Sequence, residues 1–131
     1  MKYVVFLFVL VIPMHLLSQQ NHDTTYHPRI QKPAYDFGQG PIVFIDEGHN
    51  NFHTRNGRYY AFSNLLERDG YQVLAYEEAF NKKHLAKAKI LVISNALSAL
   101  VEDYAIPNPS AFTEKEIRII KHWVAKGGNL F

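Results

Sequence analysis

The chain has 131 residues, of which 47% are hydrophobic and 14% aromatic, enough to form one domain around a single core. Lysine and arginine number 14 against 12 aspartates and glutamates, and the basic residues are scattered along the sequence. We therefore expect no nucleic-acid partner. Cysteine is absent, which excludes disulfide bonds, thiolate metal sites and a cysteine nucleophile.

The first residues have the layout of a secretory signal peptide. An apolar run follows Lys2 and ends where Pro13 breaks the helix, and the small residue Ser18 comes a few positions later. This run is shorter than the roughly 20 residues that cross a bilayer core. The sequence predicts a signal peptide at residues 1–19, no stable membrane anchor after cleavage, and export to the periplasm or the extracellular space.

Residues 20–40 predict an extended lead-in before the domain. They show no sustained period of 2 or 3.6 residues, and prolines and glycines punctuate them. His22 and His27 lie in this segment, and we interpret both as linker histidines without a ligand role.

Apolar runs and helical stripes then alternate along the chain. Residues 42–46 are continuously apolar up to Asp46 and predict a buried parallel strand. A helix is predicted from residue 58 to Gly70. In residues 71–76 apolar and polar residues tend to alternate, which predicts a strand nearer the edge of the sheet. Residues 77–88 predict a short helix or turn, and residues 89–95 a second central strand. The buried stripe of the first helix is predicted to contain Tyr59, Phe62, Leu65 and Leu66.

The clearest predicted element is a helix that begins after Thr113. Glu116, three residues later, completes a capping box with Thr113, and the glycines at 127 and 128 end the helix. Two prolines predict a surface loop before it, within residues 96–111, and residues 129–131 begin another strand. The residues predicted for the buried stripe of this helix are Ile117, Ile119, Ile120, Trp123 and Val124.

This alternation predicts an α/β fold, a three-layer open parallel sheet with helices on both faces and right-handed crossovers. The last strand is shorter than the usual length of about five or six residues, and one side of the sheet would stay unpaired. We therefore expect residues 41–131 to be the N-terminal part of a larger domain.

Four stretches of the sequence, in this order, are similar to a known family: "IDEGHNNFHT", "GRYYAFSNLLERDGYQV", "LVISNAL" and "AFTEKEIRIIKHWVAKGGNL". Together they resemble the domain-of-unknown-function 4350 family of exported bacterial proteins. The resemblance implies a class I glutamine amidotransferase-like, flavodoxin-like fold with strand order 2-1-3-4 and no established reaction. Amidotransferase activity is not expected, because it needs a nucleophilic cysteine and this chain has none.

The candidate site is the polar segment that follows the first predicted strand. Ligands of open parallel sheets bind beyond the carboxyl ends of the strands, where the winding direction reverses. This segment and Asn95, which ends the third predicted strand, are therefore expected to face one cleft. The catalytic candidates are Asp46, Glu47, His49 and His53. The ligand-binding candidates are Asn50, Asn51, Arg58 and Asn95.

Three interpretations of this segment stay open. Asp46 or Glu47, with His49 and His53, could bind a divalent metal such as zinc, manganese or iron, although no cofactor is established. A metal-free pocket could instead use the carboxylates and histidines for hydroxyl groups and Arg55 or Arg58 for an anion. In the third interpretation Asp46 and the asparagines only stabilise turns.

The sequence thus predicts an exported α/β domain that binds a small polar ligand, such as a carbohydrate, at the strand-end cleft, with hydrolysis as an option. The alternatives are a non-catalytic module that scaffolds envelope proteins, and an inert truncated product. An exposed patch formed by Tyr59, Tyr60 and Trp123 would favour the scaffold.

Overall fold

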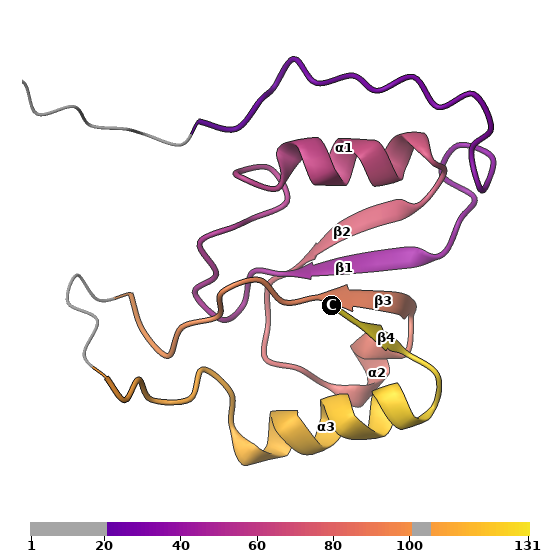
Figure 1. Ribbon diagram of the computed structural model, residues 1–131. Coiled ribbons are helices and arrows are strands. Elements are labelled where there is room, and N and C mark those ends of the chain that lie inside the picture. The colour runs from indigo at the N-terminus through magenta and orange to yellow at the C-terminus, as the bar shows by residue number, and fades with distance from the viewer. Residues whose placement is uncertain (1–20, 101–105) are drawn as a thin grey trace, which may run out of the picture.

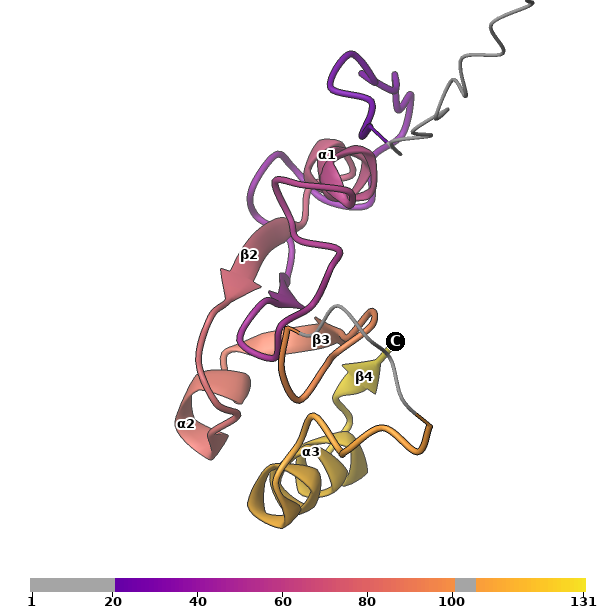
Figure 2. The same ribbon diagram turned by 90° about the vertical axis from the view of Figure 1, so that its left-hand side faces the viewer.

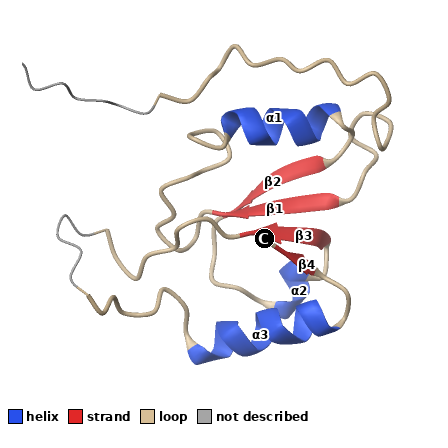
Figure 3. Ribbon diagram, in the orientation of Figure 1, coloured by secondary structure: helices blue, strands red, loops and turns tan. Residues whose placement is uncertain are grey.

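A computed structural model describes residues 21–100 and 106–131 of the chain. It contains a four-stranded parallel sheet with strand order β2-β1-β3-β4 and helices on both faces (Figures 1 and 3). The predicted α/β fold with an open parallel sheet is confirmed. The strands are β1 (Ile42–Asp46), β2 (Gln72–Tyr76), β3 (Ala88–Val92) and β4 (Asn129–Leu130), and the helices are α1 (Tyr60–Arg68), α2 (Lys82–Leu85) and α3 (Glu114–Ala125).

The predicted signal peptide at residues 1–19 lies outside the described residues. Within the part of the chain that the structure covers, no helix combines the length and the apolar character needed to cross a bilayer.

The positions of the strands in the sheet explain their sequence patterns. β1 lies between β2 and β3 in the sheet, and both of its faces are packed, Phe44 on the α2 and α3 side and Val43 and Ile45 on the α1 side, so its residues are almost uniformly apolar. β2 lies at the edge, and its buried Val73 and Tyr76 flank the exposed Leu74. The predictions of a central first strand and an edge second strand are confirmed.

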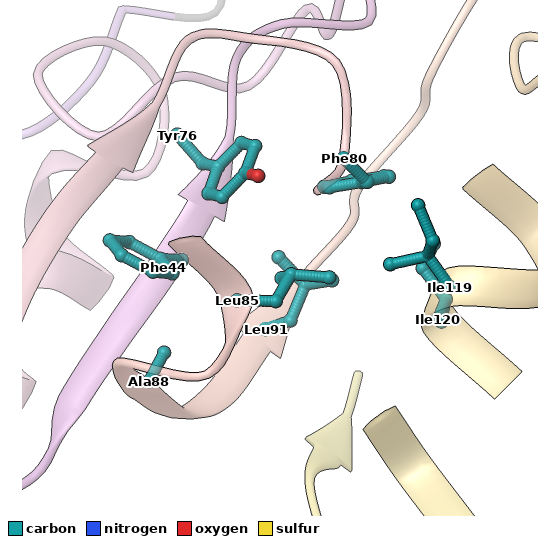
Figure 4. Packing of buried hydrophobic residues seen from close by; sticks show 8 residues of the cluster. All are labelled: Phe44, Tyr76, Phe80, Leu85, Ala88, Leu91, Ile119 and Ile120. Atoms are coloured by element: carbon teal, nitrogen blue, oxygen red, sulfur yellow. The ribbon is translucent and has the colours of Figure 1, made fainter. Parts of the chain in front are cut away.

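Two apolar layers hold the helices against the sheet. Figure 2 shows α1 on one side and α2 and α3 on the other. On the α2 and α3 side, Phe80, Leu85 and Ile119 point toward Phe44 and Leu91 of the strands (Figure 4). On the α1 side the buried residues are Val43, Ile45, Val73 and Val92, with Tyr59, Leu66, Tyr71 and Ile90 packed against them.

The predicted buried stripe of α1 is wrong in part. Tyr59 and Leu66 contact the sheet, and Ser63 is buried between them in the sequence, but Phe62 and Leu65 are 39% and 37% exposed. The helix therefore faces the sheet with positions 59, 63 and 66, an equally good helical spacing. The lead-in passes along α1 (Figure 1).

The capping box of α3 is confirmed, and part of its predicted stripe is wrong. Thr113 Oγ1 accepts a hydrogen bond from the Glu116 N–H at 3.3 Å, and Glu116 Oε2 accepts one from the Thr113 N–H at 2.9 Å. The buried residues of α3 are Glu116, Ile119 and Ile120, whereas Val124 is 40% exposed. The helix is turned so that the glutamate of its own cap faces the interior.

Candidate functional site

Two loops meet beyond the carboxyl ends of β1 and β3. The Leu97 N–H donates to the His49 carbonyl at 2.8 Å, and the Asn50 side chain donates to the Leu97 carbonyl at 3.1 Å. Asn50 has a φ of 49°, a left-handed conformation that asparagine adopts more readily than most residues. The predicted proximity of these two loops is confirmed.

His49 is buried between two carboxylates. Its Nδ1 lies 2.8 Å from Asp46 Oδ1 at the end of β1, and its Nε2 lies 2.9 Å from Glu116 Oε1 in the first turn of α3. The rings of Phe80 and Phe112 lie against the imidazole, with centroid distances of 4.5 and 4.8 Å. The side chain is therefore enclosed by two acids and two aromatic rings.

This environment favours a charged imidazole. A neutral ring has one N–H and donates to one carboxylate, whereas the imidazolium donates to both. Burial alone would lower the pKa of His49, but its hydrogen bonds with Asp46 and Glu116 outweigh burial and raise that pKa. The two neighbouring aromatic rings also stabilise a cation.

Glu116 joins this histidine to α3 and to the segment before α2. Its Oε1 accepts the Phe80 N–H at 3.0 Å in addition to the histidine, and its Oε2 accepts the Thr113 hydroxyl at 2.7 Å. Burial would raise the pKa of Glu116, but the bonds from Thr113, His49 and Phe80 lower it from 4.5 to about 2. One buried carboxylate thus connects three parts of the chain.

Asp46 extends the same network toward the surface. Its Oδ2 accepts a hydrogen bond from the Asn51 side-chain amide at 2.7 Å, and Asn51 Oδ1 accepts one from the backbone N–H of Asn95 at 3.1 Å. The buried network is therefore continuous from Glu116 through His49, Asp46 and Asn51 to the loop after β3.

Glu47 turns away from this network. Its Oε1 accepts the backbone N–H of Arg55 at 2.6 Å within the same loop.

The loop leaves β1 close to the chain after β2, so that a Cβ on Gly48 would lie 2.7 Å from the Glu78 carbonyl oxygen. Position 48 therefore requires glycine for this close backbone approach.

An outer layer of partly exposed side chains lies over the buried network. His53 Nδ1 lies 3.2 Å from Asn95 Oδ1, and the same oxygen accepts the Phe52 N–H at 3.1 Å. The Arg58 guanidinium lies 3.5 Å from the centre of the Phe52 ring, and the His53 and Tyr59 rings are 4.9 Å apart. We call His53, Asn95, Phe52, Arg58 and Tyr59 the rim.

A surface hollow of about 270 Å³ adjoins the rim. His53, Arg58 and Tyr59 line it together with Asn21 and His22 of the lead-in. His22, interpreted from the sequence as a free linker histidine, therefore lies at the site. The lead-in forms one wall of the hollow.

The structure brings together some of the predicted site residues and separates others. Asp46, His49, Asn51, Asn95 and His53 form one hydrogen-bonded series. The predicted metal set is not assembled, because Glu47, His49 and His53 bond to different partners. Within residues 21–100 and 106–131, no group of three or more histidines and acids is placed to hold a metal ion.

The sequence interpretation missed three residues around His49, namely Glu116, Phe80 and Phe112. Glu116 is 67 positions away from His49, so no spacing rule connects the two. The only local signal was the capping box, which places the Glu116 side chain beside the N-terminus of its helix.

The fold and site define a parallel α/β domain with a buried polar network and an exposed polar rim beyond the carboxyl ends of its central strands. No family model, curated protein or solved structure matches this chain. The resemblance to the domain-of-unknown-function 4350 family stays a prediction.

Proposed function

We propose that this protein binds a small neutral polyol, such as a carbohydrate, at the rim. One observation carries the proposal: His53 and Asn95 come from different strand-end loops and are held together at the surface. The position agrees with the general location of ligand sites in open parallel sheets. The strand order β2-β1-β3-β4 places the change of winding direction between β1 and β3, directly below these two side chains.

The hydrogen bonds define what the rim offers a ligand. Asn95 Oδ1 accepts from the Phe52 N–H and faces His53 Nδ1, so the ring donates through Nδ1 and a neutral ring keeps a lone pair on Nε2. Among the described residues neither His53 Nε2 nor the Asn95 amide nitrogen has a partner. His53 and Asn95 thus present one acceptor and one donor, which suits hydroxyl groups because each can both donate and accept.

The aromatic side chains of the rim complement this polar pair. Phe52 is 52% exposed, and Tyr59 lies beside the hollow. Carbohydrate rings have apolar C–H faces beside their hydroxyl groups, and ligand sites generally combine apolar walls with a few placed polar groups. This combination favours a sugar over an inorganic ion.

The proposal is for binding, and it assigns no reaction. Both nitrogens of His49 are engaged by carboxylates, so this residue is a positioning residue rather than a base. Glu47 is occupied by the Arg55 N–H. A hydrolytic step, which the sequence leaves as an option, would have to use His53 as its base.

The proposal includes the family and the location expected from the sequence. We infer an exported protein of the domain-of-unknown-function 4350 type with a flavodoxin-like, glutamine amidotransferase-like fold. The support is the ordered set of four motifs, the signal-like N-terminus and the parallel sheet with its strand order.

A scaffold role has less support. The feature that would favour a scaffold is an exposed patch of Tyr59, Tyr60 and Trp123. All three are only partly exposed, and they come from α1 and its start on one sheet face and from α3 on the other.

The test measures the binding of glucose, galactose, N-acetylglucosamine and mannitol by saturation-transfer NMR. We expect at least one of the four to bind, and His53→Ala and Asn95→Ala to weaken that binding about tenfold, as loss of one hydrogen bond of about 1.4 kcal/mol predicts. His27→Ala and Asn108→Ala are matched controls outside the rim and should bind as the wild type does. Absence of binding to all four, or equal binding by rim and control variants, would overturn the proposal.

A further inference from the structure

Basic residues gather on the α2 and α3 side of the sheet. From residue 77 to the C-terminus, the described residues contain eight lysines and arginines and four acids, Glu77, Glu78, Glu114 and Glu116. Glu116 is buried on His49, and Glu114 pairs with Arg118 at 3.9 Å. Glu78 pairs with His84, and among the described residues from 77 onward no lysine takes part in an ion pair.

A groove of about 400 Å³ lies within this layer. It is bounded by α2, the last turn of α3 and the starts of β3 and β4, at the end of the strands opposite the rim. Lys82, Lys89, Lys126 and His122 contribute its polar groups. Its apolar lining consists of Ala86, Ala88, Ile119 and Trp123.

Two contacts fix the walls of the groove. The Trp123 indole lies so close to Gly128 that a Cβ there would be 2.3 Å from the ring. Lys89 Nζ donates to the Gly127 carbonyl at 2.8 Å, which holds the ammonium group at the groove. The aromatic surface and one of the charges are therefore positioned before any ligand arrives, which lowers the entropic cost of binding.

Among the described residues, no carboxylate balances the positive charge in the groove, and Lys82, Lys89 and Lys126 take part in no ion pair. The dipole at the C-terminal end of α3 is enough to explain a cation such as Lys126 there. It does not explain Lys82 and Lys89, which come from α2 and β3. Several cations around a concave apolar surface attract an anion.

We propose that this groove binds a small organic anion with a planar apolar part. The planar part would lie against Trp123, and a phosphate or carboxylate group would accept hydrogen bonds from Lys82, Lys89 and Lys126. The volume is within the range of about 300 to 1,000 Å³ that is usual for small-molecule sites.

Trp123 is the only tryptophan in the chain, so its fluorescence reports directly on the groove. The probes are phenyl phosphate and benzoate as aromatic anions, inorganic phosphate as an anion without a ring, and benzyl alcohol as a neutral ring. We expect a saturable fluorescence change with at least one aromatic anion, weakened by added salt, and much weaker binding of the other two probes. The stronger of the two aromatic anions identifies phosphate or carboxylate as the preferred group.

Matched lysine variants separate this site from general surface charge. Lys82→Gln and Lys126→Gln should each weaken binding about tenfold, because each removes a charge-assisted hydrogen bond. Lys121→Gln removes the same charge from an exposed position of α3 outside the groove and should leave binding unchanged, and so should His53→Ala at the rim. The proposal is overturned if neither aromatic anion binds saturably, if inorganic phosphate binds as tightly, or if Lys121→Gln weakens binding as much as Lys126→Gln.

Discussion

His49 and Glu116 are 67 positions apart in the sequence and are joined by a hydrogen bond of 2.9 Å between Nε2 and Oε1. The bond connects the loop after β1 to the first turn of α3. Because Glu116 also caps its own helix, the same side chain begins α3 and fixes the loop below the rim. This relationship accounts for the direction in which α3 faces the sheet.

Breaking this pair should strongly destabilise the protein. Glu116→Gln keeps a side chain that can cap α3 but removes the negative charge beside His49, and loss of one partner of a buried ion pair costs about 3–5 kcal/mol. Urea unfolding measures the effect. Glu114→Gln, an exposed glutamate in the same turn, is the control and should change the free energy of unfolding by less than about 1 kcal/mol. Equal effects of the two variants would contradict the importance of the pair.

The same pair predicts a pH dependence of stability. The pKa of His49 is raised in the folded state, so its contribution is complete below the ordinary value of 6.5 and is lost as the pH rises through the folded pKa. The pKa of Glu116 is lowered to about 2, so its contribution is complete above 4.5 and is lost as the pH falls toward 2. These two groups therefore stabilise the fold most between about pH 4.5 and 6.5.

Unfolding in urea at a series of pH values tests this dependence. In the wild type the free energy of unfolding should fall on the alkaline side of the window. His49→Gln should abolish that alkaline fall, because glutamine does not titrate. An alkaline fall of the same size in this variant would show that another group is responsible.

Asn51→Asp should destabilise the buried network and weaken the rim. The substitution keeps the shape but replaces the amide that donates to Asp46 Oδ2 at 2.7 Å with a second carboxylate oxygen. We expect a loss of about 2 kcal/mol or more, together with weaker sugar binding, because Asn51 also holds the backbone of Asn95. Thermal unfolding measures the first effect, and Asn108→Asp at an exposed position is the control. A stability equal to that of the control would argue against a buried Asn51.

Thr113→Ala should shorten or loosen the start of α3. It removes the hydroxyl that accepts the Glu116 N–H and donates to Glu116 Oε2, and loss of an N-cap costs about 1 kcal/mol. Amide hydrogen exchange in the first turn of α3 should become faster, whereas Thr113→Ser, which keeps the hydroxyl, should stay close to the wild type. Unchanged exchange in the alanine variant would contradict a role for this cap.

The elements and their order were determined by the sequence itself. The apolar run at β1 predicts a strand covered on both faces, and the alternation at β2 predicts an edge strand. Thr113 and Glu116 predict the start of α3 because a capping box is a local interaction within four residues. These predictions succeed because period, turn residues and caps depend on neighbours in the chain.

The faces of the helices and the partners of the site residues were decided only by the tertiary structure. Several helical stripes of similar apolar character were available in α1 and α3, and packing selected those with Ser63 and Glu116 inside. His49 could have been a metal ligand, a base or a turn residue until Glu116 and two aromatic rings, all distant in sequence, enclosed it. The physical reason is that hydrogen bonding and burial of a polar group depend on which distant segments the fold places beside it, and no local spacing encodes that choice.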